Sequence, residues 1–282
     1  MDVARALEWG ERMLRESGID TARRDVEILL QELLDMDRSA LYLDRNRVLL
    51  PEQKTMFEQW IKQRCARMPL QYVLHKAWFM DMELYVDERA LIPRPETELL
   101  VEVVIKEAKR MPGPLQVLDI GTGSGAIAIA LVRHMSDCRV WAVDISPDAL
   151  AVARINVDKY SLQQRVALLE GNLFEPVKGM AFDIIVSNPP YIVRDDLIEL
   201  EPEVRSEPQL ALNGGDDGLD FYRELCHAGE LLKPHGFLAL EIGYDQGQAV
   251  SDILKGCGFK DIQVLKDFAN MDRIVLAHSL AL

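Results

Sequence analysis

Residues 117–131 read VLDIGTGSGAIAIAL. An apolar run with the character of a buried strand ends at Ile120, and Gly121, Gly123 and Gly125 follow before a helical pattern begins. Glycine lets the backbone turn tightly and come close to a ligand, and the first N–H groups of a helix have no partner within it. The stretch therefore predicts a strand, a ligand-binding turn and a helix.

The same alternation continues along the chain. Short apolar runs, separated by helical stretches and turns, occupy residues 115–120, 139–145, 165–170, 182–188, 237–243 and 262–267. A last run at 272–279 follows so closely that we expect it to pair antiparallel with its neighbour. This pattern predicts an α/β fold, a mostly parallel seven-stranded sheet with helices on both faces. Ligands of such sheets bind at the carboxyl ends of the strands, where the strand order reverses.

A helical pattern precedes this region. We assign residues 1–70 to a small all-helical domain, residues 71–93 to a linker with a hairpin at 71–86, and residues 94–282 to the domain that carries the chemistry. Helices are expected at 21–34, 51–68 and 95–110. The side chains expected to face inward from the first two helices are Val26, Leu29, Leu30, Leu33, Leu34, Met56, Trp60, Ile61 and Cys65.

The charge of the chain disfavours a nucleic-acid partner. Its 282 residues carry 32 basic and 46 acidic side chains, a net charge of −14. Residues 1–75 hold 12 basic and 13 acidic side chains, so the other 20 and 33 give the rest of the chain a net charge of −13. A protein that holds nucleic acid chiefly by neutralising phosphates needs the opposite balance.

The remaining composition predicts a soluble cytoplasmic protein. Four cysteines lie far apart without a CxxC pair, and the five histidines are scattered, so we expect no metal site and no disulfide framework. The N-terminus lacks the apolar core of a signal peptide, and no run approaches the ~18 apolar residues that span a membrane. A monomer is the simplest expectation.

An acidic residue ends the second strand of the pattern. Asp144 lies 23 residues after Gly121, where a carboxylate can accept hydrogen bonds from both hydroxyls of an adenosine ribose. Nicotinamide and adenosyl cofactors share this requirement, and Gly121, Gly123 and Ala126 fit the dinucleotide pattern. Asp119 before the first glycine, together with NPPY after a later strand, instead resembles the class I S-adenosylmethionine-dependent methyltransferases.

The NPPY segment comprises Asn188, Pro189, Pro190 and Tyr191. An amide nitrogen is a poor nucleophile because its lone pair is delocalised into the carbonyl group. The Asn188 side-chain oxygen and the Pro189 main-chain oxygen offer acceptors for the N–H donors of a primary amide or an aromatic amine. The two prolines fix the backbone, and Tyr191 would cover the flat face of the target group. An amide and a nucleic-acid base remain equally possible targets on this evidence.

Further blocks surround this segment: ALIPRPETELLVE at 90–102, EPEVRSEPQLALNGGDDGLDFYR at 201–223 and LALEIGYDQG at 238–247. In this order they resemble the HemK/PrmC family, protein N5-glutamine methyltransferases that act on peptide chain release factors. The resemblance covers nearly the whole chain. It implies S-adenosyl-L-methionine as cofactor and the glutamine of the release-factor GGQ loop as substrate, with a role in translation termination.

The resemblance also implies roles for individual residues. The methionine end of the cofactor would lie on Gly121, Thr122, Gly123, Ser124 and Gly125. Asp144 would bind the ribose, Asn172 and Leu173 would border the adenine, and Asn188 would touch the cofactor side and the target amide. Pro189, Pro190 and Tyr191 would complete the glutamine pocket. Asn172 stands where the family more often has an acidic residue, so we expect weaker cofactor binding.

Several alternatives stay open at this point. An adenine-N6 nucleic-acid methyltransferase shares NPPY, a related branch modifies a ribosomal-protein glutamine, and a non-catalytic adenosyl-binding module or a nicotinamide oxidoreductase would share the glycine turn. The acidic residues 194–209 could form a lid or a docking rim for a basic protein, or only a solvated face. The preferred release factor, the movement of the helical domain and the oligomeric state are not determined by the sequence.

Overall fold

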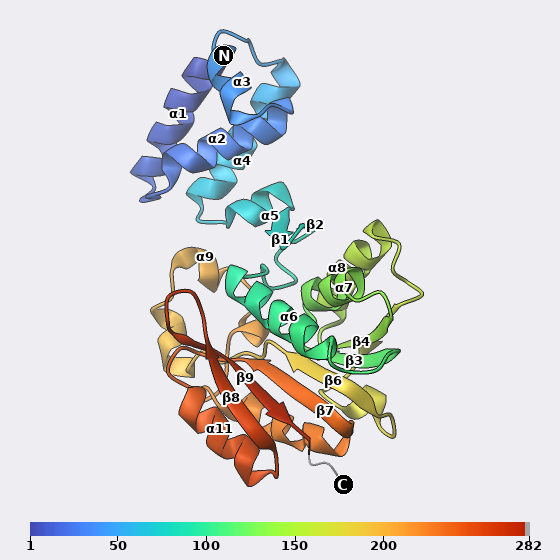
Figure 1. Cartoon of the computed structure of the whole chain (residues 1–282). Coiled ribbons are helices and arrows are strands. Elements are labelled where there is room, and N and C mark those ends of the chain that lie inside the picture. The colour runs from blue at the N-terminus through green and yellow to red at the C-terminus, as the bar shows by residue number, and fades with distance from the viewer. Residues whose placement is uncertain (280–282) are drawn as a thin grey trace. The chain divides into compact units, whose positions relative to one another are not determined.

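The computed structural model of the chain describes residues 1–279, which form two compact units (Figure 1). One unit comprises residues 1–75 and 201–206, and the other comprises residues 76–200 and the chain from 207 onward. The domain boundaries at residues 70 and 93 drawn from the sequence stay a prediction.

The first unit is helical, and its helices begin where the sequence provides caps. The Asp2 carboxylate accepts a hydrogen bond from the Arg5 N–H at 2.8 Å, and the Asp37 carboxylate accepts one from the Ala40 N–H at 2.7 Å. Pro51 opens a helix at a position where the missing N–H has no intrahelical role. The helices are α1 (Val3–Glu16), α2 (Ala22–Leu34), α3 (Arg38–Leu43), α4 (Pro51–Cys65), α5 (Leu70–Leu74) and the short α9 (Pro202–Arg205).

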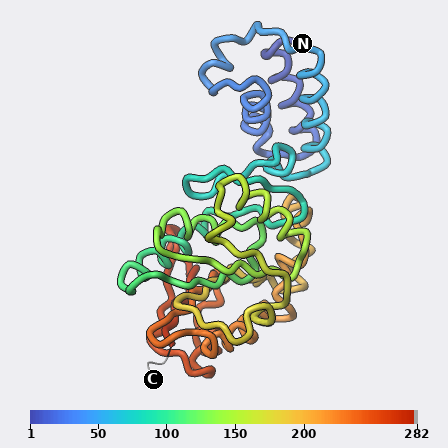
Figure 2. Tube along the Cα trace, turned by 90° about the vertical axis from the view of Figure 1, so that its right-hand side faces the viewer, coloured from blue at the N-terminus to red at the C-terminus, as the bar shows by residue number. Residues whose placement is uncertain are grey.

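The core of this unit lies where α1, α2 and α4 pack against one another. These helices lie in the blue to cyan part of the trace in Figure 2. The inward positions predicted for the first two helices are buried or partly buried, with one exception. Met56 is 47% exposed, so its predicted burial was wrong. The buried face of α4 runs through Phe57, Ile61 and Arg64, and successive helical residues point about 100° apart. Met56 therefore turns away from the core.

A charged cluster is buried inside the helical unit. Arg64 is only 5% exposed and forms ion pairs with Asp25 and with Glu203 of α9, both at 2.8 Å. Glu203 also pairs with Arg67 at 2.7 Å. Buried charges are tolerated when each has a partner, because an unpaired one keeps its full desolvation penalty. The segment 201–206, distant in sequence, thus completes the helical unit.

The second unit is built on a seven-stranded sheet with strand order β5-β4-β3-β6-β7-β9-β8 (Figure 1). Among the described strands, neighbouring pairs are parallel except those that involve β9. The predicted α/β sheet and its antiparallel last strand are confirmed. The strands are β3 (Leu115–Ile120), β4 (Cys138–Asp144), β5 (Val166–Glu170), β6 (Phe182–Ser187), β7 (Leu232–Glu241), β8 (Lys260–Lys266) and β9 (Asp272–His278).

Helices cover both faces of this sheet. One face packs against α6, α7 and α8, and the other packs against α10, the 3₁₀ turn η4 and α11. Because β3 is covered on both faces, its residues are buried almost without interruption rather than at alternate positions. The helices are α6 (Pro95–Ala108), α7 (Ala126–His134), α8 (Pro147–Lys159), α10 (Asp220–Leu225) and α11 (Gly247–Gly256), and the 3₁₀ turns are η1 (Glu175–Val177), η2 (Arg194–Ile198), η3 (Gln209–Ala211) and η4 (Cys226–Glu230).

The strand order reverses next to β3. The chain runs outward from β3 through β4 to β5 and then returns to place β6 on the other side of β3. The carboxyl ends of these parallel strands meet at one edge of the sheet. This edge is the place where ligands of open α/β sheets bind.

The predicted hairpin at 71–86 is only partly correct. Strands β1 (Ala77–Phe79) and β2 (Met82–Leu84) pair antiparallel, but residues 71–74 belong to helix α5. Pro69 stands as its N-cap, and Tyr72 and Val73 are buried from the resulting helical turn. Aromatic residues favour strands, but burial on a short helix uses the same residue types, so this pattern does not distinguish the two.

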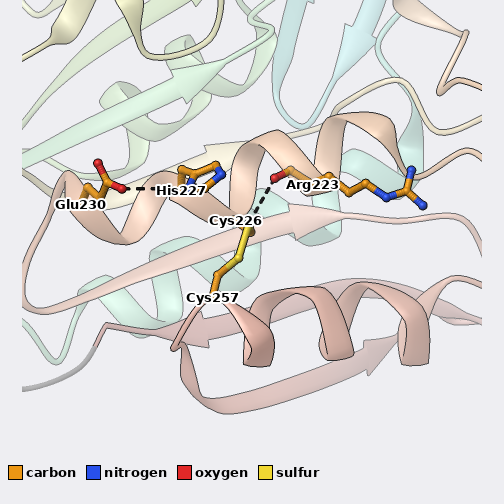
Figure 3. Close-up of a disulfide and its surroundings, with 5 residues drawn as sticks. All are labelled: Arg223, Cys226, His227, Glu230 and Cys257. Carbon is orange, nitrogen blue, oxygen red and sulfur yellow. Dashed lines mark hydrogen bonds and ion pairs between the residues drawn. A yellow bond between two sulfur atoms is a disulfide. The ribbon is translucent and has the colours of Figure 1, made fainter.

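Two of the cysteines form a disulfide. Cys226 of η4 is joined to Cys257 after α11, across a sequence separation of 31 residues (Figure 3). The sequence suggested no disulfide, and that expectation was wrong for this pair. The Cα atoms lie 5.9 Å apart because η4 and α11 pack on the same face of the sheet, which cysteine spacing does not reveal. Cys65 and Cys138 are free.

Within residues 1–279, no helix has both the length and the apolar character needed to cross a membrane.

Candidate active site

A cavity of about 880 Å³, including the part open to solvent, lies at the carboxyl ends of β3, β4 and β6. All of its lining residues belong to the sheet unit. Eight of the residues predicted for the site line this cavity: Gly121, Gly123, Asp144, Asn172, Leu173, Asn188, Pro189 and Pro190. The remaining predicted residues, which do not line it, are Thr122, Ser124, Gly125 and Tyr191.

The glycine turn presents bare backbone to the cavity. Gly121 and Gly123 have φ angles of 72° and 55°, which side chains rarely adopt, and a Cβ placed on either would meet nothing within 4 Å. The space beside them is therefore open to a ligand. Gly125 has another role, because an added Cβ would lie 3.4 Å from Ala153 Cβ and from Ile129 Cδ1, where α7 packs closely.

The buried carboxyl group of Asp119 holds the turn on the side away from the cavity. Thr122 Oγ1 donates to Asp119 Oδ2 at 2.6 Å, and the Thr122 and Ser124 side chains are buried rather than facing the cavity. Burial raises the pKa of Asp119 to about 7, and the charge of Asp144 acts in the same direction. Asp119 Oδ1 has no hydrogen-bond partner among the described residues. These groups shape the turn from within.

Asp144, at the end of β4, is oriented by two backbone donors. Its Oδ2 accepts from the Gly123 N–H at 2.8 Å, and its Oδ1 accepts from the Ser146 N–H at 2.9 Å. Burial raises the pKa of Asp144, although both N–H donors oppose this effect. Each carboxylate oxygen retains acceptor capacity beyond these bonds, which suits a pair of hydroxyl donors.

The end of β5 supplies the neighbouring wall. Gly171 leaves the strand with a φ of 156°, and Leu173 adopts a left-handed φ of 45°. Asn172 and Leu173 both line the cavity, and the Asn172 side chain is exposed. Ile145 and Ala149, which the sequence reasoning did not single out, add apolar surface to the same cavity. An amide beside apolar side chains is a suitable surface for a flat polar ring.

The NPPY segment begins directly after β6. Ser187 Oγ donates to the Ile120 main-chain oxygen at 2.7 Å, which joins the ends of β6 and β3. Asn188 is half-buried on the cavity wall, and its Nδ2 donates to Thr97 Oγ1 of α6 at 3.0 Å. Tyr191 turns instead toward Glu241 at the end of β7, with its hydroxyl 3.4 Å from Glu241 Oε1. Burial raises the pKa of Tyr191, so its hydroxyl keeps its proton.

The GGDDGL sequence, residues 214–219, packs against the backbone of the NPPY segment. The Gly214 N–H donates to the Ile192 main-chain oxygen at 2.8 Å, and a Cβ at Gly214 would lie 2.7 Å from Tyr191 Cα. Gln246 Nε2 donates to the main-chain oxygens of Tyr191 and Gly218 at 3.0 and 3.2 Å. Only glycine lets the two loops lie this close.

Residues 90–94 and 207–211 are joined beside the cavity. The buried Glu207 carboxylate accepts from the Ile92 N–H at 3.0 Å and forms an ion pair with Arg94. This holds residues 90 and 91 and residues 208–211 together, and both strips contribute lining residues. Arg94 was not predicted as a site residue, and the structure gives it this supporting contact rather than a place on the cavity wall.

Sequence reasoning missed several residues of the site. Thr97 and Glu241 contact the NPPY segment, and Arg89, Phe221 and Leu225 line the cavity. Glu241 carried a usable signal, because it lies near the end of the run predicted at 237–243, and β7 ends there at the same sheet edge as Asp144 and Asn188. The others lie on helices or loops, where nothing local indicates the cavity. Residues 1–279 contain no cluster of His, Cys, Asp or Glu that could hold a metal ion.

The geometry fits an adenosyl cofactor. The open space beside Gly121 and Gly123 suits its charged methionine end. The Asp144 carboxylate suits the hydroxyls of its ribose, and the apolar wall near Leu173 suits its aromatic adenine. Fold and site define a class I S-adenosylmethionine-dependent methyltransferase. A solved methyltransferase from Pyrococcus furiosus shares the fold with a TM-score of 0.53 at 17% identity, covering 82% of this chain and 100% of that one.

Sequence comparison narrows this class. The PrmC N-terminal domain family matches residues 5–74, and the methyltransferase small domain family matches residues 95–200. The release factor glutamine methyltransferase of Moorella thermoacetica is 43% identical over 280 residues, covering 99% of both chains. That of Geobacter sulfurreducens is 41% identical over 275 residues, covering 97% of this chain and 95% of the relative. The chain belongs to the release factor glutamine methyltransferase family.

Proposed function

We propose that the protein transfers a methyl group from S-adenosylmethionine to the side-chain amide nitrogen, N5, of the glutamine in the GGQ motif of peptide chain release factors. The observation that carries this proposal is the full-length identity of 41–43% to relatives named for that activity. The modification would modulate translation termination.

The cavity residues suggest how the cofactor would be held. When bound, S-adenosylmethionine supplies an electrophilic methyl group on a sulfonium centre. Gly121 and Gly123 would lie against its methionine end, and Asp144 would accept from the ribose hydroxyls. Asn172 and Leu173 would border the adenine. These assignments rest on the position of each residue in one cavity.

The NPPY segment would hold the substrate. The Asn188 Oδ1 and Pro189 main-chain oxygens would accept hydrogen bonds from the two N–H groups of the glutamine amide. Because the nitrogen gains positive character as it is methylated, acceptors fixed in advance stabilise the transition state more than the ground state. The two prolines reduce the reordering that this requires. Tyr191 would complete the pocket from its position against Glu241.

The protein partner is proposed to be the release factor, presented through its GGQ loop. The helical unit is proposed to dock the release factor, and the enzyme is proposed to act as a cytoplasmic monomer. The net charge of −13 on the chain outside residues 1–75 opposes direct binding of a nucleic acid. An adenine-N6 activity is therefore the less favoured candidate.

Intact-mass measurement and peptide mapping of a release factor, after incubation with the protein and S-adenosylmethionine, test the proposal. We expect one added methyl group, located on the GGQ glutamine. An Asn188→Ala variant should bind the cofactor and transfer little. Methylation at another residue, or of an oligonucleotide instead of the release factor, would redirect the assignment.

A further inference from the structure

Two buried residues outside the cavity connect to its reactive segment. Thr97 of α6 is 4% exposed and Glu241 of β7 is 1% exposed, and neither lines the cavity. Thr97 Oγ1 donates to Glu241 Oε2 at 2.6 Å, and Asn188 Nδ2 donates to Thr97 Oγ1 at 3.0 Å. The three groups form a chain of hydrogen bonds from a buried carboxylate to the cavity wall.

This chain determines which end of the Asn188 amide faces the substrate. A threonine hydroxyl has one hydrogen, and here it is donated to the Glu241 carboxylate. Thr97 can then only accept from Asn188, so the amide nitrogen must point toward α6. The amide oxygen is left on the cavity side, where an acceptor for the substrate N–H is needed. Asparagine oxygen and nitrogen positions are assigned from such networks.

We infer that Glu241, acting through Thr97, is a positioning residue that holds the Asn188 amide with its oxygen toward the target glutamine. The inference rests on the proposed function for the identity of the substrate. Its structural part, the orientation of Asn188, does not depend on that substrate.

Glu241 also holds the other end of the NPPY segment. Its Oε2 reaches Asn188 through Thr97, and its Oε1 receives the Tyr191 hydroxyl at 3.4 Å. One carboxylate therefore anchors both ends of a segment whose two middle residues are prolines. Hydrogen bonds in a low-dielectric interior polarise one another, which strengthens the chain.

Loss of the Glu241 charge removes the constraint on the direction of the network. A protonated carboxyl can donate to Thr97 as well as accept from it, and when it donates, the Thr97 hydroxyl is free to donate to the Asn188 oxygen. This favours the flipped amide, which presents N–H donors to a substrate that also offers donors. The carboxylate form, which can only accept, is therefore the form that fixes the productive orientation.

The surroundings of Glu241 place this change near neutral pH. Burial raises the pKa of Glu241 to about 7, and the charge of Glu96 of α6 acts in the same direction. The pKa is lowered by the Thr97 hydroxyl, by Arg273 of β9 and by the Tyr191 hydroxyl. The Tyr222 hydroxyl of α10 also faces this residue, donating to its main-chain oxygen at 2.9 Å. We expect kcat to rise with pH through about 7.

Three variants of the full-length chain test the inference by kinetics. Thr97→Val removes the hydroxyl at nearly constant volume and should lower kcat for the release factor about tenfold to a hundredfold, with the cofactor Kd unchanged. Thr97→Ser restores the hydroxyl and should return kcat to within roughly threefold of wild type. Glu241→Gln should remove the rise of kcat near neutral pH.

Tyr222→Phe is the matched control. It removes a buried hydrogen bond to Glu241, but from the main-chain oxygen rather than from the carboxylate. We expect its kcat and pH profile to match wild type even if thermal stability falls. A loss of kcat equal to that of Thr97→Val would mean that any damage near Glu241 has this effect, and would overturn the inference, as would wild-type kinetics for Thr97→Val.

The chain of hydrogen bonds from Glu241 through Thr97 to Asn188, called the relay from here on, can be followed by NMR spectroscopy without substrate. In ¹⁵N-labelled protein, the Asn188 side-chain NH₂ signals, identified by their absence in Asn188→Ala, should shift with pH around a midpoint of about 7. The shift should be lost in Glu241→Gln and in Thr97→Val, and kept in Tyr222→Phe. A shift that persists in Thr97→Val would refute the relay. If the wild type shows the shift but never methylates a release factor, the proposed function fails while the relay stands.

Discussion

Replacing Gly214 with alanine should impair catalysis through a contact that lies outside the cavity. An alanine Cβ would lie 2.7 Å from Tyr191 Cα, 2.8 Å from Tyr191 C and 2.9 Å from Gly218 Cα. All three are backbone atoms of loops that are hydrogen-bonded to each other, so no flexible side chain can yield. The backbone of the NPPYI segment must move away.

The size of the movement follows from the geometry. Ordinary van der Waals contact of a Cβ begins at 3.4 Å, so the 2.7 Å approach requires a displacement of 0.7 Å. Misplacing a reacting group by about 1 Å can reduce the rate about a hundredfold. We expect kcat for release-factor methylation to fall about tenfold to a hundredfold, and stability to fall by about 1–3 kcal/mol from overpacking.

Kinetics and thermal unfolding on the same preparations measure both effects. Gly229→Ala is the matched control, because its Cβ would meet only the Phe259 ring, at 3.7 Å, in ordinary contact. Its kcat should equal that of the wild type. Cofactor affinity of Gly214→Ala should change little, since Gly121, Gly123 and Asp144 are untouched. Wild-type kcat for Gly214→Ala, or an equal loss for Gly229→Ala, would refute the steric reasoning.

Three further predictions concern charge. Glu203→Gln removes the carboxylate that Arg64 and Arg67 share. Because Arg64 keeps its ion pair with Asp25, we expect the free energy of unfolding in urea to fall by about 3 kcal/mol, the lower end for a broken buried pair. An unchanged free energy would show that α9 contributes nothing to the stability of the helical unit. Burial raises the pKa of Asp119 from 3.8 to about 7, so between these pH values the native state binds more protons at this group than the unfolded state does, and stability falls as pH rises. Asp119→Asn should flatten this dependence of the unfolding free energy on pH, measured by urea unfolding at several pH values, and an unchanged dependence would contradict the burial argument. Asn172→Asp should bind S-adenosylmethionine roughly fivefold more tightly by calorimetry, because a charged acceptor makes the stronger hydrogen bond; equal dissociation constants would remove the expected effect of Asn172.

Sequence patterns located the sheet and its ligand edge because those depend on local order. Each apolar run from Leu115 onward became a strand, and residues at strand ends or directly after them, such as Asp144 and Asn188, came together at one edge. The chain direction of a parallel sheet is enough for that inference. The contact of Thr97 with Asn188 joins residues 91 positions apart, and no local pattern reports it.

Contacts between helices and loops were harder to predict for the same reason. The Cys226–Cys257 pair depends on how η4 and α11 pack, and the short helix at residues 70–74 uses side chains that also suit a strand. The prediction for Met56 was wrong because the apolar side chains of α4 cover a wide arc, and the sequence does not show which part of that arc faces the core. These errors all concern which neighbour a side chain meets, whereas the element type was mostly correct.

The passage of residues 201–206 into the helical unit has a consequence for modularity. The chain crosses between the units after residues 75, 200 and 206, so the helical part is not a simple N-terminal extension. Cutting after residue 75 would leave Arg64 and Arg67 without Glu203. A chimera that exchanges helical domains between relatives would therefore need to exchange this hexapeptide as well, because otherwise the helical domain of one relative would be paired with the 201–206 segment of another.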